Sequence, residues 1–419
     1  MKRIELGEHS EVPVDLDGDQ LDAITEAAAG RIGVRRVAGG GHLLSSGSHV
    51  GVLAAGDVQI AVQPKVPIHN LFLMLGVKAP EFTATPATFG LDDDLLTAMV
   101  RIFVRAVESA TSRGVLRGYR HREERLISPR GRIDIAAQIR RPGLPSPIPC
   151  RFDEFTADID ENRALIAALD RLRRVPAIST ELRAQLLHLV PRFADVPVVA
   201  VDPATVDAWR ANRINRHYEV ALRLAAVILR SVTLRNVDGD VVAPSFMINM
   251  NDLFQDFVAD RLRTALRGRL DVIEEPAVHL GASRRLAMRP DLVFRPPASG
   301  RRTPAVYVGD AKYKLSSGPA RMSDYYQLLA YTTALGLDDG VLIYAQRPDP
   351  SPGGSSDDAL IEDPLGDEPV HSVRIRNTTT TLHVYRLPLT GTNAEVEAGL
   401  VDLADWVHRR QRRTFLAAV

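Results

Sequence analysis

The stretch VYVGDAKYKL, residues 306–315, decides how the C-terminal part of this chain folds. It reads as a strand in which Asp310 and Lys312 stand two positions apart, and strand alternation places such residues on one face. Lysine is rare here, because only 5 of the 52 basic residues are lysine and all others are arginine. A compact ammonium is a movable point charge, whereas a guanidinium is a broad fork. We therefore expect Lys312 to do what arginine cannot.

A second acidic strand, AMRPDLVFR at residues 287–295, precedes this one and carries Asp291. We expect a neighbouring strand to bring Asp291 beside Asp310. Two carboxylates and the backbone carbonyl of Ala311 form an oxygen-rich set that suits Mg²⁺, with Mn²⁺ as a substitute. A lysine beside such a set can orient or help deprotonate a water, while the metal stabilises charge on a phosphate. The pattern thus predicts hydrolysis of a phosphodiester.

A cross-strand ion pair on an exposed sheet face is the alternative for an aspartate and a lysine at this spacing. We favour the catalytic interpretation because buried charges in apolar strands are costly unless they have a ligand. Lys314 lies on the same face. Two residues of strand rise, about 6–7 Å, should carry it beyond the metal's ligands.

The composition limits the remaining choices. Formal net charge is zero, yet residues 113–151 hold ten arginines against three acids, which suits either phosphate contacts or a solvated surface. The single cysteine excludes an intramolecular disulfide, and no Cys/His spacing of the zinc type occurs. The first residues lack the apolar core of a signal peptide, and no apolar run approaches about 18 residues. We expect a cytoplasmic protein that does not associate with membranes.

Three regions follow from the hydropathy pattern, and together they predict an α/β multidomain protein. Residues 1–95 form a small β-rich domain, with hairpins between 30 and 65. Residues 96–240 are helical, interrupted by a proline-broken loop at 140–152. Residues 241–419 alternate helices and strands, including one strand at 271–280, as in an α/β domain of nuclease size.

The last region resembles the PD-(D/E)xK nuclease superfamily, whose restriction-endonuclease-like fold it is then expected to share. Asp291 and Asp310 stand in the two acidic positions and Lys312 in the lysine position. The segment QLLAY is similar to the Q-x-x-x-Y helix of the RecB-like branch, where Gln327 and Tyr331 would support the site or contact DNA. Core packing of an amphipathic helix is the alternative for these two residues.

One position departs from the superfamily pattern. Many of these nucleases have a glutamate on the first helix, and the segment LFQDFV offers Gln255 there instead. The sequence therefore leaves open which residue supplies a third carboxylate ligand, and Glu274 and Glu275 are further candidates.

Four more stretches resemble McrC, the nuclease subunit of McrBC modification-dependent restriction systems. They are AVQPKVPIHNLFLMLG, SPRGRIDIAAQI, RFDEFTADIDENRALIAAL and MNDLFQDFVADRL, in the family's order over nearly the whole chain. The resemblance implies an Mg²⁺-dependent endonuclease that cleaves double-stranded DNA containing 5-methylcytosine. It also implies docking on, and stimulation of, a hexameric McrB-like AAA+ GTPase. The chain contains no Gly-Lys dipeptide and hence no P-loop, so we expect it to bind no nucleotide itself.

The resemblance also supplies candidate contacts outside the nuclease region. Arg130, Arg132 and Arg163 are candidates for DNA contacts or for salt bridges between domains. Arg35, Arg36 and Asp57 are candidates for contacts with the partner, with ordinary hairpin turn chemistry as the alternative.

Two other functions fit part of the pattern. A non-catalytic activator of an AAA+ motor could keep a vestigial nuclease fold, but the intact acids and lysine disfavour decay. A RecB-like repair nuclease is the second, and the β-rich N-terminal region disfavours it.

Overall fold

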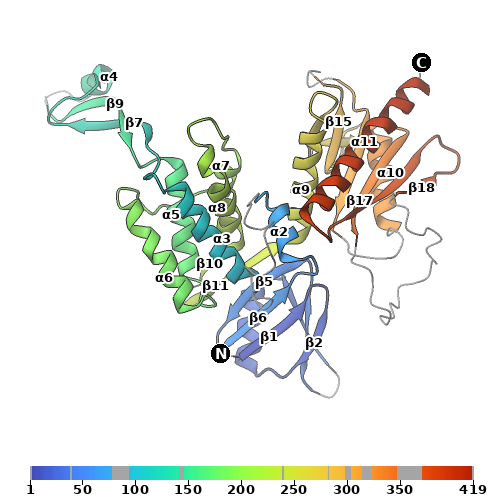
Figure 1. Cartoon of the computed structure of the whole chain (residues 1–419), viewed down its shortest axis with the longest axis horizontal. Coiled ribbons are helices and arrows are strands. Elements are labelled where there is room, and N and C mark those ends of the chain that lie inside the picture. The colour runs from blue at the N-terminus through green and yellow to red at the C-terminus, as the bar shows by residue number, and fades with distance from the viewer. Residues whose placement is uncertain are drawn as a thin grey trace. The chain divides into compact units, whose positions relative to one another are not determined.

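The computed structural model describes residues 2–37, 40–77, 94–140, 146–237, 240–281, 283–297, 303–313, 322–346 and 370–417. The chain forms two compact units, Met1–Gln63 with Thr85–Ile248, and Pro64–Ala84 with Asn249–Val419. Within the described part there are eleven α-helices and several sheets (Figure 1). The expected α/β multidomain class is confirmed. No helix in the described ranges is both long and apolar enough to cross a membrane.

The first unit begins with two sheets and one helix. The five-stranded sheet has the order β1-β6-β5-β11-β10, with β1 Lys2–Gly7, β5 His49–Ala55, β6 Val58–Gln63, β10 Val232–Val237 and β11 Asp240–Asn249. The three-stranded sheet has the order β2-β4-β3, with β2 Glu11–Val14, β3 Ile32–Arg36 and β4 His42–Ser46. Helix α1, Gly18–Ala28, begins with a capping box between Asp17 and Gln20. The hairpins predicted between residues 30 and 65 are confirmed.

A close backbone approach joins β11 to the N-terminal sheet. Gly51 on β5 has φ +131°, and a Cβ there would lie 2.1 Å from the carbonyl oxygen of Phe246. Only glycine admits this contact. Residues up to 248 therefore belong with the first unit and cross the predicted boundary at 240.

Helices are found in the middle region as predicted, although they cover only part of it. They are α3 Leu95–Ala110, α5 Asp160–Arg173, α6 Thr180–Leu189, α7 Pro203–Asp207 and α8 Glu219–Ser231. Asp94 caps α3 by accepting a hydrogen bond from the Thr97 N–H at 2.8 Å.

A three-stranded sheet with the order β7-β9-β8 follows α3, where helix and then a loop at 140–152 were expected. Its elements are β7 Gly118–Leu126, β8 Arg132–Ile133 and β9 Ile148–Thr156, with the short helix α4 Ile135–Ile139. The prediction was wrong because β7 buries no side chain fully along its length and β9 buries only two. A mostly polar strand such as β7 lacks the apolar alternation that identifies a strand in a sequence, and the prolines before and within β9 indicated a loop.

The second unit is built around a six-stranded mixed sheet. Its order is β12-β15-β16-β17-β19-β18, with β12 Asp271–Glu274, β15 Leu292–Arg295, β16 Tyr307–Lys312, β17 Asp339–Gln346, β18 Val370–Arg374 and β19 Thr381–Pro388. Strand β15 runs antiparallel to β16, and β16, β17 and β19 run parallel to one another. Helix α10, Met322–Leu335, is the crossover between β16 and β17, as parallel neighbours require.

The strand predicted at 271–280 is two strands. The chain bends at Glu275, which has φ +43°, so β12 ends there and β13, Val278–Leu280, pairs instead with β14, Leu286–Met288. Left-handed backbone at a non-glycine residue is unusual, and the sequence gives no sign of it.

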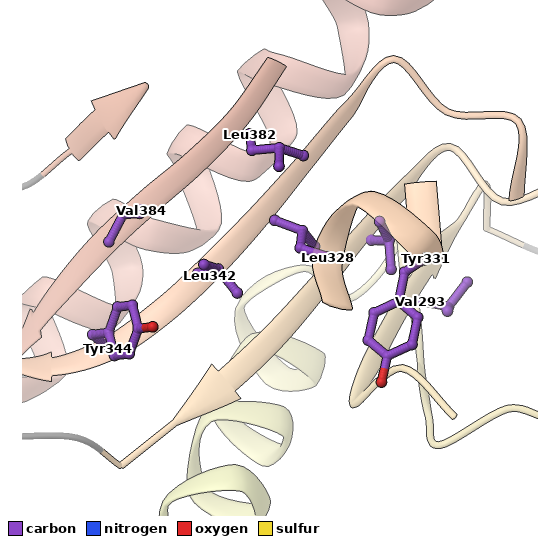
Figure 2. Close-up of a cluster of buried hydrophobic side chains, with 8 residues drawn as sticks. Val293, Leu328, Tyr331, Leu342, Tyr344, Leu382 and Val384 are labelled. Carbon is purple, nitrogen blue, oxygen red and sulfur yellow. The ribbon is translucent and has the colours of Figure 1, made fainter. Parts of the chain in front are cut away.

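Helix α10 covers one face of the six-stranded sheet. Leu328 and Tyr331 pack among Val293, Leu342, Leu382 and other buried side chains (Figure 2). The helix lies close to the sheet at Gly340, where a Cβ would come within 2.8 Å of Thr332 Cγ2.

Two helices, α9 Met250–Ala265 and α11 Asn393–Ala417, belong to the opposite side of the sheet. Trp406 of α11 stacks edge-on against Tyr307 and His383, and Phe254 of α9 lies 6.0 Å from Tyr313 between ring centroids. The short helix α2, Ile68–Met74, also belongs to this unit. Asn70 donates to the carbonyl of Leu389 at 2.9 Å, so the helix lies outside the first unit although it precedes residue 95.

Candidate active site

Strand β16 presents its acid and its lysine on the face that α10 covers. Val308 lies in the core under α10, and alternation places Asp310 and Lys312 on the same side. Asp310 is fully buried, and Lys312 Nζ lies 2.9 Å from its Oδ2. The expected placement of the two side chains on one face is confirmed.

Pairing of β15 with β16 brings the second acid to the same place. Leu292 is opposite Gly309, so the same register places Asp291, one residue earlier, opposite Asp310. Its Oδ2 accepts a hydrogen bond from the Ala311 N–H at 2.8 Å, and its side chain is buried. The expected proximity of Asp291 to Asp310 and Ala311 is confirmed.

The site carries more buried negative charge than positive charge. Burial raises the pKa of Asp291 to about 7, and repulsion by Asp310 adds to the effect. Burial likewise raises the pKa of Asp310, although Lys312 opposes it. Burial alone would lower the pKa of Lys312, but the attraction of Asp310 more than offsets this, so the pKa is raised and the ammonium stays charged. One ammonium cannot neutralise two carboxylates, so the site can bind a further cation or a proton.

The residues present fit a magnesium ion. Asp310 Oδ1 is buried and has no hydrogen-bond partner among the described residues, which is costly unless a cation supplies the missing interaction. The donors are carboxylate and carbonyl oxygens, which Mg²⁺ prefers, and Mg²⁺ usually keeps several waters. In the ranges that the structure describes, no group of three or more His, Cys, Asp or Glu side chains is arranged to hold a metal. Asp291, Asp310 and the Ala311 carbonyl would therefore be its protein ligands.

The two residues of the QLLAY segment form a chain of hydrogen bonds toward Asp291. Gln327 Nε2 donates to the Tyr331 hydroxyl at 2.7 Å, and that hydroxyl donates to the Arg289 carbonyl at 3.1 Å. Arg289 stands two residues before Asp291, so the chain fixes the backbone that enters the site. Tyr331 is also part of the core under α10, so it both packs in the core and holds the backbone that leads to Asp291.

Gln255 also reaches the site, through one intermediate. Its Nε2 donates to Glu275 Oε1 at 3.0 Å, and the Glu275 N–H donates to the Asp291 carbonyl at 3.2 Å. Glu274, the other candidate acid, forms an ion pair with Arg263 instead. Of the two candidates for a third carboxylate, only Glu275 lies at the backbone of Asp291.

A further buried acid, Asp324, which was not predicted from the sequence, lies in the first turn of α10. The Tyr344 hydroxyl donates to its Oδ2, and Tyr344 is the register partner of Lys312. Besides burial, which is the main cause, the charge of Asp324 contributes to the raised pKa of Asp310. A signal existed, because Asp324 shares the apolar helix face of Leu328 and Tyr331 at spacings of four and three.

Comparison with known families settles membership. The model of the family described as McrBC 5-methylcytosine restriction system component matches residues 44–345. The chain belongs to this McrBC component family. The resemblance noted in the sequence is thereby confirmed.

Two solved structures from Thermococcus gammatolerans resemble this McrBC component. A chain in the refined half-complex from a tetradecameric assembly of McrB AAA+ hexamers with bound McrC is 17% identical, with a TM-score of 0.57 over 97% of this chain and 100% of that chain. A chain in the cryo-EM structure of the McrBC complex is 19% identical, with a TM-score of 0.43 over 63% of this chain and 88% of that chain. No curated protein matches.

The other candidate residues of the McrBC component lie away from this site in the sequence, in the first unit. Arg163 forms a bidentate pair with Asp158, at 2.5 and 3.0 Å, within that unit. A salt bridge between domains, the alternative considered for it, is therefore not what the structure shows. The guanidinium of Arg130 stacks over Phe152 at 4.9 Å, and Arg132 is exposed on β8. DNA contacts by these arginines stay a prediction.

The candidates for partner contacts are all exposed. Arg35 lies 3.6 Å from Glu11, Arg36 ends β3, and Asp57 accepts from Gln20 Nε2 at 3.1 Å. Their role stays a prediction. Lys314, the second lysine of the opening stretch, lies outside the described residues.

The buried Asp291 carboxylate should make the free energy of unfolding depend on pH. Unfolded, it releases its proton near pH 3.8, and folded, near pH 7, so the folded state binds more protons between these values. The free energy of unfolding therefore falls as pH rises through this window. We expect Asp291→Asn to raise the free energy of unfolding by about 2–4 kcal/mol at pH 8, since each pH unit between the two pKa values contributes about 1.4 kcal/mol.

Urea unfolding in the absence of divalent metal measures this effect. The stabilisation of the variant relative to the wild type should shrink as the pH is lowered toward 4, where Asp291 is largely protonated in both states. A variant that is less stable than the wild type at pH 8 would contradict the assigned burial and charge of this site.

Proposed function

We propose that this McrBC component is an Mg²⁺-dependent DNA endonuclease of the PD-(D/E)xK type. The observation that carries the proposal is the buried Asp310, with an ammonium 2.9 Å from one oxygen and no hydrogen-bond partner on the other in the described part of the chain. The mixed sheet supports it, because both acids lie on adjacent strands beneath one crossover helix. A vestigial fold would have no reason to keep two buried carboxylates and a partly buried ammonium that cost folding free energy.

Each side chain then has a role in phosphodiester hydrolysis. Asp291, Asp310 and the Ala311 carbonyl would hold Mg²⁺. When bound, the ion would stabilise the negative charge that builds on the phosphate and lower the pKa of a water. Lys312 would orient the attacking water and hold a proton at Nζ, since its ammonium is fixed by Asp310. The Gln327–Tyr331 chain would keep Asp291 in register with Ala311.

We also propose that the chain acts with a separate AAA+ GTPase on double-stranded DNA that contains 5-methylcytosine. The family description names a 5-methylcytosine restriction system, and the similar fold comes from an assembly of McrB AAA+ hexamers with bound McrC. The absence of a Gly-Lys dipeptide in the sequence supports a motor on another chain.

The experiment that tests this proposal separates the chain from its motor. We expect the purified chain to bind neither GTP nor ATP by calorimetry and to cut methylated DNA slowly, because it lacks a P-loop. Adding the cognate AAA+ protein, GTP and Mg²⁺ should switch cleavage on, and EDTA should switch it off. Tight nucleotide binding by this chain alone, or cleavage that persists in EDTA, would overturn the proposal.

A further inference from the structure

The segment that leads into Asp291 is unusually basic. Residues 276–290, PAVHLGASRRLAMRP, contain three arginines and one histidine and no acid. In the whole chain, acids and bases are equal in number, at 52 each. A run of this kind creates a local positive field on a protein that has no net charge.

The three arginines of this segment are exposed in the folded chain. Val278 is opposite Met288 in the β13–β14 pair, and Met288 packs against the core under α10. Alternation then places Arg289 on the opposite side, where it is exposed. Arg284 and Arg285 are exposed in the connection between the strands. We call β13, β14 and these three arginines the arginine hairpin.

Several other arginines of the second unit are paired with an acid. Arg261 pairs with Glu397 at 3.2 Å, Arg269 with Asp405 at 2.7 Å, and Arg410 with Asp339 at 3.5 Å. Within the described residues, the three arginines of the hairpin form no ion pair. Their charge is available to an anion from outside the chain.

The hairpin is held at a fixed place beside the site. The Tyr331 hydroxyl donates to the Arg289 carbonyl, and α10 contacts β13. Two residues of chain span at most about 7 Å, so the Cα atom of Arg289 lies within that distance of the Cα atom of Asp291. A duplex held by the hairpin would therefore lie against the segment of chain that leads into Asp291.

We propose that the arginine hairpin binds the phosphate backbone of duplex DNA next to the bond that is cleaved. This inference rests on the proposed nuclease function. The guanidinium is suited to phosphate because its planar fork donates two parallel hydrogen bonds. Phosphate contacts position a duplex without reading its sequence, so the hairpin would bind modified and unmodified DNA alike.

Fluorescence anisotropy with an unmodified 30-base-pair duplex tests the proposal on the full chain. It is done without divalent metal, at several KCl concentrations, so that no cleavage occurs. The test variant is Arg284→Ala/Arg285→Ala/Arg289→Ala. The matched control is Arg267→Ala/Arg374→Ala/Arg376→Ala, three exposed arginines of the same unit; Arg374 ends the far edge strand β18 and Arg376 follows it.

We expect the test variant to bind at least about tenfold more weakly near 0.1 M salt, since each lost phosphate contact removes about 0.9 from the salt slope. The control should stay within about twofold of the wild type. Equal binding by the test variant, equal weakening by the control, or no duplex binding by the wild type at the lowest salt would overturn the inference.

The failure of this inference can be told apart from failure of the proposed function. If Asp310→Asn is inactive while the test variant binds duplex like the wild type, only the inference fails. If the test variant loses binding while Asp310→Asn still cleaves, the proposed catalytic site fails and the binding surface stands.

Discussion

Asp310→Asn should lower the rate of DNA cleavage by several orders of magnitude while leaving the fold and partner binding intact. The substitution keeps the shape of the side chain but removes a carboxylate that would hold Mg²⁺ and that anchors Lys312 Nζ at 2.9 Å. A catalytic metal contributes several kcal/mol of transition-state stabilisation, so loss of one ligand affects the rate far more than stability. The fold should tolerate the change because a buried charge is replaced by a neutral amide.

The measurement is single-turnover cleavage of methylated duplex with the AAA+ partner, GTP and saturating Mg²⁺. Differential scanning calorimetry of the same sample checks the fold, and the increase in melting temperature caused by Mg²⁺ should be lost. Asp271→Asn is the matched control, since Asp271 is an exposed acid on β12 of the same sheet. If Asp310→Asn cleaves like this control, the metal site has been misassigned.

Lys312→Arg should be nearly as inactive as Lys312→Ala, although it keeps the positive charge. The Lys312 side chain is 23% exposed and faces a fully buried carboxylate, so the space around Nζ suits a compact ammonium. A guanidinium is wider, and its very high pKa prevents it from exchanging a proton with water. Loss of a general acid or base costs about 10²–10⁴ in rate, and both variants should fall in this range.

The same cleavage assay compares the two variants, and Lys2→Arg, in the first unit, controls for the exchange of lysine for arginine. A structural ion pair would behave differently, because arginine would restore a contact to Asp310 and with it the activity. Activity of Lys312→Arg at the wild-type level would therefore show that Lys312 supplies only charge.

Local patterns predicted the parts of the site that depend on neighbours in the chain. Asp310 and Lys312 share a face because a strand alternates with a period of two and the pairing of β16 is regular here. Spacings of three and four residues likewise identified the long helices of the first unit. The order of motifs over the whole chain was sufficient to recognise the McrBC component family.

Patterns failed where an element is mostly polar or contains prolines. Strand β7 buries no side chain fully and is mostly polar, so it was not recognised as a strand. Strand β9 does alternate around Cys150 and Phe152, but its prolines indicated a loop. The predicted boundaries at 95 and 240 also missed two segments that join distant parts of the chain. Asn70 bonds to the Leu389 carbonyl, and β11 pairs with β5 across the close approach at Gly51.

The sequence by itself determined which residue types stand together on β16 and which family the chain resembles. Only the tertiary structure decided the surroundings of these residues. In the folded chain Tyr344 donates a hydrogen bond to Asp324, Gln255 donates to Glu275, and Tyr331 donates to the Arg289 carbonyl. These contacts join residues 20 to 42 positions apart through strand pairing and helix packing, which depend on the whole core. Hydrogen bonds of this kind leave no period in a sequence, because each partner satisfies the other only after the chain has folded.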